Sequence, residues 1–235
     1  MFCKTILECN ICISNHTDIM IKGVIFDLDG TLANSIEDIA DSMNQVLEEN
    51  NFPTHDYATY KTFVGRGVKT LVEKSLPLEN RDTTEIEKNF DRMMQVYDEN
   101  CIVKTCLYPG IKDLLDALSE RNIKISVFSN KANELTQKVV KVLLADWKLE
   151  YVLGAGGDIP RKPDPKGAIL ISEKMRIDPS ELMYIGDSGV DMATAQNSGM
   201  HAVGVLWGFR DMEELLTNGA QTILEKPMDL MTSFD

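Results

Sequence analysis

Apolar runs of strand length alternate with segments of helical periodicity along most of the chain, and this alternation restricts the fold more than any other feature. Strands that alternate with helices of this length are typical of βαβ units, whose right-handed crossovers place helices on both faces of a parallel sheet. The sequence therefore predicts an α/β fold with ligands bound beyond the carboxyl ends of the strands. The expected strands are 21–26, 123–128, 151–153, 182–185 and 202–205, and the expected helices are 111–121, 134–145, 165–175 and 190–198.

Residues 36–105 interrupt this alternation, because they show helical periodicity and no run that resembles a strand. A helical module of this size, inserted after the first strand, is the expected arrangement. Its hinges are expected at 33–36 and 104–108. Met93 and Tyr97 recur at helical spacing and are interpreted as part of its core. The expected helices are 36–49, 67–76 and 84–99.

The chain is therefore expected to divide into a core, made of residues 20–35 and 106–235, and a helical insertion of residues 36–105. Residues 1–19 lack the basic start, the continuous apolar stretch and the small-residue cleavage site of a signal peptide. Because Met20 immediately precedes the first strand, residues 1–19 are interpreted as a dispensable N-terminal extension.

Composition argues against several classes of partner. The 235 residues carry a formal net charge of −13 and no cluster of Lys and Arg, which argues against nucleic acid. No segment approaches the roughly 20 apolar residues that a membrane span needs. The five cysteines are odd in number and lack the spacing of a disulfide framework, so a cytoplasmic location is expected. Cys9 and Cys12 have no second pair at zinc-site distance. A monomer or a homodimer is expected.

Two carboxylates, Asp27 and Asp29, directly follow the first apolar run. Side chains at this spacing face a shared space as the chain leaves a sheet, and two like charges that close are costly without a cation or a proton between them. The pair therefore indicates a metal ion, a nucleophile with a proton shuttle, or both. The alternative from this segment alone is a solvated turn, since Asp29 and Gly30 form a common turn dipeptide.

Two further strand ends carry groups that suit an anion. Ser129, Asn130 and Lys131 follow one strand, where a hydroxyl and the amides at the start of a helix would bind an anion, although a helix N-cap is the simpler interpretation. Lys162 precedes a helix that begins at a proline, and the neighbouring prolines restrict the backbone that holds it. Taken alone, Lys162 would be interpreted as a solvated surface lysine.

Asp187 and Asp191 add two acids at a fourth strand end, where Asp191 alone could complement a helix dipole. Acid, hydroxyl, lysine and acid at four separate strand ends are hard to explain as coincidence. Oxygen ligands from Asp27, Asp29 and Asp187 suit a hard divalent ion, and Mg²⁺ is expected. The lysine and the metal would offset the acids and accept a phosphate.

These motifs, in this order, resemble those of the haloacid dehalogenase superfamily of phosphotransferases, and the resemblance covers nearly all of residues 20–230. It implies a Rossmann-like parallel-sheet core with an inserted α-helical cap. It also implies that Asp27 attacks phosphorus and forms an aspartyl-phosphate, while Asp29 protonates the leaving oxygen and later activates water. Mg²⁺ would be held by Asp27, the backbone carbonyl of Asp29 and Asp187, with Asp191 supporting the metal shell.

The same resemblance implies a set of substrate-binding residues. Ser129 and Lys162 would hold the phosphoryl oxygens, and Lys162 is also expected to act in catalysis. Thr31, at the end of the first strand, and Asn130, next to Ser129, are also expected to bind the substrate.

Residues 63–67 of the insertion resemble the cap loop of phosphoglycolate phosphatases. Arg66, flanked by two glycines, could reach a carboxylate on the substrate; a flexible loop with an exposed arginine is the alternative. The expected function is Mg²⁺-dependent hydrolysis of a small phosphorylated metabolite, with 2-phosphoglycolate as the first candidate. Pyrophosphatase, sugar-phosphate phosphatase and β-phosphoglucomutase-type mutase fit the same core. A 2-haloacid dehalogenase is disfavoured by Asp29, because halide displacement needs no acid, and a non-catalytic binding protein is disfavoured because every catalytic position is filled.

Overall fold

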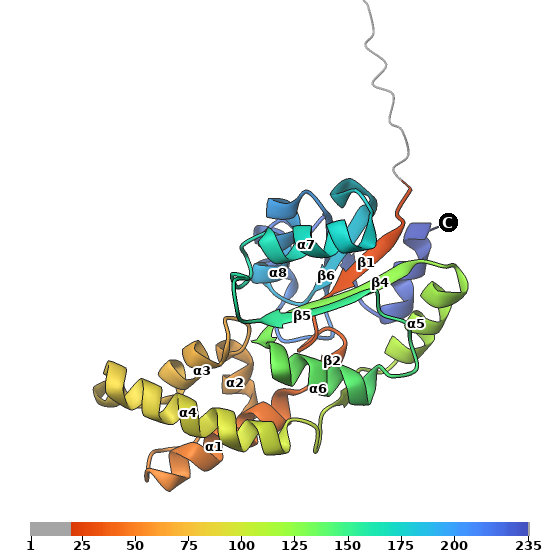
Figure 1. Ribbon diagram of the computed structural model, residues 1–235. Coiled ribbons are helices and arrows are strands. Elements are labelled where there is room, and N and C mark those ends of the chain that lie inside the picture. Colours follow the sequence, from red (N-terminus) through yellow and green to blue (C-terminus); the bar gives the residue numbers. More distant parts are fainter. Residues whose placement is uncertain (1–19, 235) are drawn as a thin grey trace, which may run out of the picture.

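Strand β1 (Gly23–Phe26) lies inside a six-stranded sheet in the computed structural model, which describes residues 20–234 (Figure 1). The strand order is β5-β4-β1-β6-β7-β8, and every pairing between neighbours is parallel. The predicted α/β fold with a parallel sheet is confirmed. The other strands are β4 (Lys124–Ala132), β5 (Tyr151–Ala155), β6 (Leu182–Gly186), β7 (His201–Val205) and β8 (Thr222–Leu224).

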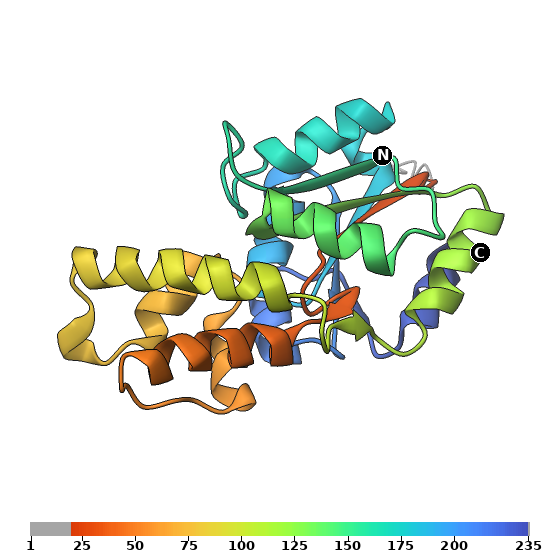
Figure 2. The ribbon, with the colours of Figure 1, turned by 60° about the horizontal axis from the view of Figure 1, so that its bottom comes forward.

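Both faces of the sheet are buried under apolar side chains. Successive side chains of a strand point to opposite faces, so each strand contributes to two separate clusters. In β1, Val24 and Phe26 belong to one apolar cluster and Ile25 belongs to another. Figures 1 and 2 show helices on either side of the sheet, as right-handed crossovers require. The first cluster includes residues of α5 (Ile111–Glu120) and α6 (Asn133–Leu143), and the second includes residues of α7 (Lys166–Met175) and α8 (Gly189–Ser198).

The alternation of helix and strand continues beyond the last predicted strand, with α9 (Met212–Thr217) before β8. Neither element was predicted, because each is short and buries one residue, Leu215 in α9 and Leu224 in β8. Such elements show too little apolar periodicity to be recognised. The described residues also form three 3₁₀ segments, η1 (Leu78–Asn80), η2 (Pro179–Glu181) and η3 (Pro227–Phe234).

Four helices occupy residues 36–105 and lie to one side of the sheet (Figures 1 and 2). Three of them match the predicted ranges. The fourth, α2, was not predicted, because Tyr60 is its one buried residue. Met43 and Leu47 of α1 and Met93 and Val96 of α4 are buried in the core of this helical insertion. The helices are α1 (Ile36–Glu49), α2 (Tyr57–Phe63), α3 (Val68–Ser75) and α4 (Thr83–Asn100).

The two chain segments that join the insertion to the sheet pair with each other. Strand β2 (Ala33–Asn34) pairs antiparallel with β3 (Cys106–Leu107). Asp38, which is buried, accepts hydrogen bonds from the backbone N–H groups of Lys104 and Thr105 at 2.8–3.0 Å and from the Thr105 hydroxyl at 2.7 Å. The expected hinge segments are therefore held side by side by a two-stranded ribbon and one carboxylate.

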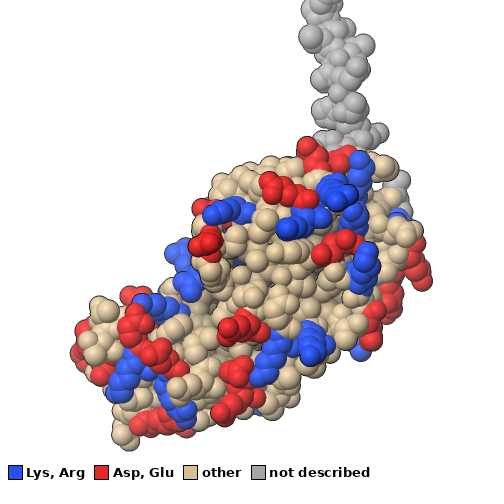
Figure 3. Space-filling view, in the orientation of Figure 1, with Lys and Arg blue, Asp and Glu red and all other residues tan. Residues whose placement is uncertain are grey.

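Charged side chains of both signs are interspersed on the face shown in Figure 3. On this face the basic groups do not gather into a surface of the kind that binds a nucleic-acid backbone. None of the helices within residues 20–234 is long and apolar enough to span a membrane. The N-terminal extension, with Cys9 and Cys12, lies outside the described residues.

Candidate active site

Asp27 and Asp29 leave the sheet at the carboxyl end of β1. The backbone N–H of Asp27 still donates to Ile185 of β6 at 2.9 Å, and the chain then turns back at Gly30. Gly30 has φ of +90°, and a Cβ there would lie 2.3 Å from an oxygen of Asp187. The turn therefore requires glycine on two grounds, its backbone conformation and the close approach of Asp187.

The Asp27 carboxylate is paired with Lys162, whose ammonium lies 2.9 Å from Asp27 Oδ1. The same ammonium lies 2.6 Å from Asp191 Oδ1, and both partners are buried. Burial raises the pKa of Asp27 to about 7; Lys162 opposes this rise and Asp191 adds to it. Burial would lower the pKa of Lys162, but the two carboxylates outweigh it and hold that pKa well above its ordinary value. Lys162 is thus a fixed cation beside Asp27.

Asp27, Asp187 and Asp191 form a buried acidic cluster, in which one oxygen of each lies within 4.8 Å of the others. Asp187 accepts a hydrogen bond from the backbone N–H of Phe209 at 2.7 Å. Burial, with the charges of Asp191 and Asp27, raises the pKa of Asp187 well above its ordinary value. The Lys162 ammonium, which contacts Asp27 and Asp191, supplies one positive charge against the three carboxylates of the cluster. An oxygen-only donor set that lacks positive charge fits a hard divalent cation such as Mg²⁺.

Asp191 is held by the start of α8. Its Oδ2 accepts hydrogen bonds from the backbone N–H of Ser188 at 3.1 Å and from the Ser188 hydroxyl at 2.6 Å. Its Oδ1 is the oxygen that contacts Lys162. Both of its oxygens are therefore engaged by protein groups, and Asp191 orients Lys162 within the cluster.

Asp29 has different surroundings from Asp27. Its Oδ1 accepts a hydrogen bond from the Ser35 hydroxyl at 2.6 Å and lies 2.9 Å from the ammonium of Lys131. Lys131 also contacts the Tyr97 hydroxyl on α4. The carboxylate of Asp29 is thus not part of the acidic cluster, and the contribution of its backbone carbonyl to a metal site stays a prediction.

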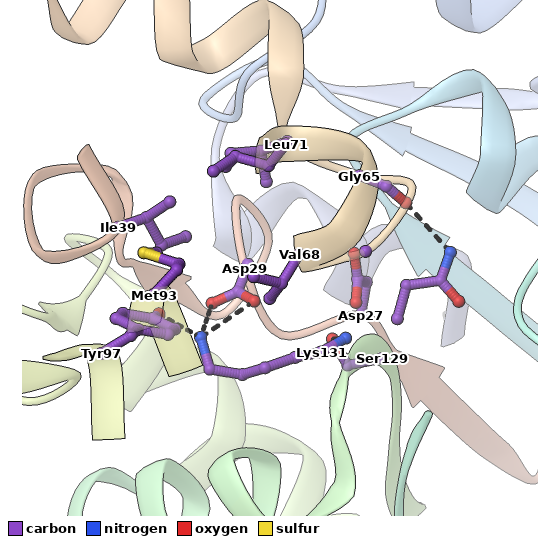
Figure 4. Close-up of a pocket in the computed structure, with 13 residues that line it drawn as sticks. Asp27, Asp29, Ile39, Gly65, Val68, Leu71, Met93, Tyr97, Ser129 and Lys131 are labelled. Carbon is purple, nitrogen blue, oxygen red and sulfur yellow. Dashed lines mark hydrogen bonds and ion pairs between the residues drawn. The ribbon is translucent and has the colours of Figure 1, made fainter. Parts of the chain in front are cut away.

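A small cavity of about 50 Å³ lies between the sheet and the helical insertion (Figure 4). Its polar wall comes from the ends of β1 and β4, and its apolar wall comes from the insertion. This arrangement presents carboxylates and a hydroxyl to a small space that apolar side chains cover. The lining residues are Asp27, Asp29, Ser129, Asn130 and Lys131 on the first wall and Ile39, Val64, Gly65, Gly67, Val68, Leu71, Met93 and Tyr97 on the second.

Ser129 and Asn130 have distinct positions at the end of β4. Ser129 is buried and lines the cavity. Asn130 also lines it, but its side chain is bonded to protein: it accepts from the backbone N–H of Lys162 at 2.8 Å and donates to the carbonyl of Gly65 at 2.9 Å. Asn130 therefore fixes the loop of Lys162 and the loop of the insertion. The helix N-cap considered for Ser129 and Asn130 is not observed, since Ala132 precedes α6.

Thr31 and Arg66 lie outside the small cavity. Thr31 is fully buried, and its hydroxyl lies 3.4 Å from Asp187 Oδ1, which places it next to the acidic cluster. Arg66 is exposed and lines a larger, open cleft of about 920 Å³, which Lys162 also lines. Val64 and Gly65 line both spaces, so the loop of Arg66 separates the small cavity from this cleft.

A family model described as haloacid dehalogenase-like hydrolase matches residues 24–205. The chain belongs to this family. The hydrolase is 32% identical over 217 residues to the phosphoglycolate phosphatase of Chromobacterium violaceum, a match that covers 90% of this chain and 96% of the relative. It is 31% identical over 195 residues to the phosphoglycolate phosphatase of Haemophilus influenzae, with 80% and 87% covered.

Solved structures agree with this membership. A crystal structure from Lactobacillus delbrueckii subsp. bulgaricus, of a protein considered to be a phosphoglycolate phosphatase, superimposes with a TM-score of 0.86 at 28% identity. The match covers 92% of this chain and 99% of that chain. The comparisons confirm the predicted family, the predicted fold and the predicted enzyme class, a phosphoric monoester hydrolase.

Several contacts within the candidate site of this hydrolase were not predicted, among them those that Ser35 and Lys131 make with Asp29 and the one that Tyr97 makes with Lys131. A lysine three residues after the last apolar residue of a predicted strand was one available signal, because a buried ammonium needs a carboxylate partner. Tyr97 was correctly interpreted as a core residue of the insertion, but its hydroxyl contact with Lys131 joins residues 34 positions apart and leaves no local pattern.

Proposed function

We propose that this hydrolase cleaves a small phosphoric monoester through an aspartyl-phosphate on Asp27, with 2-phosphoglycolate as the first candidate substrate. The observation that carries the proposal is the contrast between two neighbouring carboxylates. Asp27 lies 2.9 Å from Lys162 and within the acidic cluster, whereas Asp29 is bonded to Ser35 and Lys131. Carboxylates in separate environments can take separate roles, one as nucleophile and the other as acid and base.

In the first half-reaction, an oxygen of Asp27 forms a bond to phosphorus and the bond from phosphorus to the leaving oxygen breaks. Asp29 gives a proton to that leaving oxygen. In the second half-reaction, Asp29 takes a proton from water, and the water oxygen attacks phosphorus. The bond between phosphorus and Asp27 then breaks, which releases inorganic phosphate and restores the Asp27 carboxylate.

Lys162 and Ser129 are proposed to hold the phosphoryl oxygens. Lys162 is a buried cation next to Asp27, and Ser129 lines the same cavity as Asp27. Positive charge and hydroxyl donors at this position would stabilise the transition state, in which negative charge is spread over the phosphoryl oxygens.

Mg²⁺ is the cation that the donor set fits. Asp27 and Asp187 would hold it, with the backbone carbonyl of Asp29 as a further ligand and Asp191 in a supporting position. When bound, the ion would supply charge stabilisation for the phosphoryl group.

The helical insertion is proposed to act as a cap. Val68, Leu71 and Met93 of the insertion line the same cavity as Asp27 and Asp29, so the insertion could exclude water when a substrate binds. The paired segments β2 and β3 are the candidate hinges. An X-ray scattering profile that becomes more compact when Mg²⁺ and a phosphoryl transition-state mimic are added would support this motion; identical profiles would contradict it.

Two observations favour 2-phosphoglycolate. The cavity of about 50 Å³ suits a small substrate, and the relatives from Chromobacterium violaceum and Haemophilus influenzae are phosphoglycolate phosphatases. Arg66 is proposed to bind the carboxylate of the substrate. Its side chain is exposed on the loop between the cavity and the larger cleft, so it would have to turn inward on binding.

The test is phosphate release from a panel of phosphorylated metabolites, with Mg²⁺ or with EDTA. Asp27→Asn is compared with Asp113→Asn, the same substitution at an exposed position of α5. We expect Mg²⁺-dependent release from 2-phosphoglycolate, lost in Asp27→Asn and retained in Asp113→Asn. Release from pyrophosphate or sugar phosphates alone would keep the chemistry and contradict the substrate. Interconversion of hexose phosphates without net phosphate release would indicate a mutase.

A further inference from the structure

Lys131 is a buried cation to which the proposed chemistry gives no role. It lies at the end of β4, and its side chain is 2% exposed. Its ammonium lies 2.9 Å from Asp29 Oδ1 and 3.2 Å from Asp29 Oδ2. It thus contacts both oxygens of the carboxylate that is proposed to act as acid and base. Figure 4 shows this ammonium between Asp29 and Tyr97.

The contacts of Asp29 define the orientation of its carboxylate. Ser35, which lies in the chain segment that leads into α1, donates to Oδ1 at 2.6 Å. Lys131 reaches the same carboxylate from β4. Two donors from different parts of the fold leave little freedom for rotation of the carboxylate, and a proton donor must lie within hydrogen-bond reach of its acceptor.

Lys131 is in turn held by the helical insertion. The Tyr97 hydroxyl on α4 contacts its ammonium, and the ammonium lies 4.6 Å from the centre of the Tyr97 ring. Tyr97 is 1% exposed. A buried ammonium is costly unless its donors have partners, so loss of the Tyr97 contact would allow Lys131 to move toward water and away from Asp29.

We infer that Lys131 is a positioning residue for Asp29, and that Tyr97 makes this position depend on the seating of the helical insertion. The inference rests on the proposed function, in which Asp29 protonates the leaving oxygen. The proton carrier then has its working orientation only when α4 is packed against the end of β4. If the insertion were not packed against the sheet, Lys131 would lose its contact with Tyr97, and Asp29 would be held by Ser35 alone.

The kinetic test compares two substrates of similar size whose leaving groups differ. 2-Phosphoglycolate releases an alkoxide-type oxygen that needs a proton, whereas acetyl phosphate releases acetate, which needs none. We expect Lys131→Met to lower kcat/KM for 2-phosphoglycolate about 100-fold, as displacement of a catalytic group does, and to lower it for acetyl phosphate much less. Tyr97→Phe should lower kcat/KM for 2-phosphoglycolate by a smaller factor, about tenfold, since the ammonium keeps its bonds to Asp29.

Two further variants distinguish the positioning of Asp29 by Lys131 from substrate binding and from a general effect on the packing of α4. Lys131→Arg keeps a cation that can reach Asp29 and should restore part of the lost kcat/KM. Lys138→Met removes a half-buried lysine on α6 that also contacts α4, through Asp98 at 3.1 Å, without contact to Asp29. This variant should leave kcat/KM unchanged for both substrates. Equal losses for 2-phosphoglycolate and acetyl phosphate in Lys131→Met, or a rise in KM with unchanged kcat, would overturn the inference in favour of substrate binding.

A crystal structure of Lys131→Met tests the inference without activity. We expect the Asp29 carboxylate, which would then be held by Ser35 alone, to leave its wild-type orientation, while the backbone of residues 27–31 stays in place. An unchanged Asp29 carboxylate would overturn the inference even in an active enzyme. Failure of the proposed function would be seen in a different experiment: the wild-type enzyme would release phosphate from none of the substrates in the panel.

Discussion

Lys162 and Asp191 form the shortest ion pair of the candidate active site, with the ammonium 2.6 Å from Asp191 Oδ1. The second contact of this ammonium is Asp27, at 2.9 Å. One buried lysine thus separates the proposed nucleophile from an acid that is itself fixed by Ser188. The electrostatic state of Asp27 depends on this arrangement.

Lys162→Met should destabilise the protein in a pH-dependent manner. At about pH 8 we expect the free energy of unfolding to fall by about 3 kcal/mol, because Asp27 and Asp191 would lose their shared cation. The pKa of Asp27 is about 7, so at about pH 5 this carboxyl is largely protonated and the loss should be smaller. Urea unfolding at both pH values measures the difference. Lys162→Arg is the control with retained charge, and equal losses at both pH values would contradict this account.

Mg²⁺ should stabilise the protein more at about pH 8 than at about pH 5. The pKa of Asp27 is raised from 3.8 to about 7, so between these values the folded chain binds a proton more tightly than the unfolded chain does. Without a divalent cation, stability therefore falls as the pH rises through this window. The cation must displace such protons, so its effect should grow with pH.

Thermal unfolding with Mg²⁺ or with EDTA measures this effect. Asp187→Asn should remove the response to Mg²⁺, whereas Asp113→Asn, on the exposed side of α5, should keep it. A response to Mg²⁺ that is the same in the wild type and in Asp187→Asn would contradict the proposed metal site.

Asp38→Asn should loosen the paired segments that join the insertion to the sheet. Asp38 accepts hydrogen bonds from two backbone N–H groups and one hydroxyl, and an amide has one acceptor oxygen in place of two. We expect the free energy of unfolding to fall by about 2 kcal/mol, the range for hydrogen bonds to a charged group. Asp41→Asn is the matched control: its exposed carboxylate pairs with the Lys104 ammonium at 2.7 Å and should contribute less than about 1 kcal/mol.

Arg66→Ala should change substrate preference more than turnover. If Arg66 binds the carboxylate of 2-phosphoglycolate, KM for this substrate should rise about tenfold or more, while KM for acetyl phosphate, which lacks a carboxylate, should change little. Lys69→Ala, an exposed lysine on α3, is the control. Unchanged relative rates for the two substrates would exclude Arg66 from recognition.

The central part of the fold was predictable from the sequence because its strands are buried on both faces and therefore read as continuous apolar runs, as Val24, Ile25 and Phe26 do. Elements that bury one residue were missed, among them α2 with Tyr60 and α9 with Leu215. The ribbon of β2 and β3 was also missed, because two-residue strands carry no period and their pairing joins residues far apart in the chain.

The candidate site was likewise predictable from the sequence only in part. Its acids, serine and lysine lie at the ends of predicted strands or in the segments that follow them, so their approximate convergence followed from the parallel sheet. Their individual partners did not, because contacts such as Lys131 with Asp29 and Asn130 with Gly65 join separate loops. The small size of the cavity is likewise a result of packing between the insertion and the sheet.

The central claim, that Asp27 becomes phosphorylated, is tested most directly by acid quenching and mass spectrometry. Asp29→Asn is mixed with acetyl phosphate and Mg²⁺, because this substrate needs no proton for its leaving group and the variant lacks the base for the second half-reaction. The account predicts a phosphoryl group on the peptide that contains Asp27, and none in the double variant that also carries Asp27→Asn. A phosphoryl group on another residue, or phosphate release from 2-phosphoglycolate by Asp27→Asn at the wild-type rate, would contradict it.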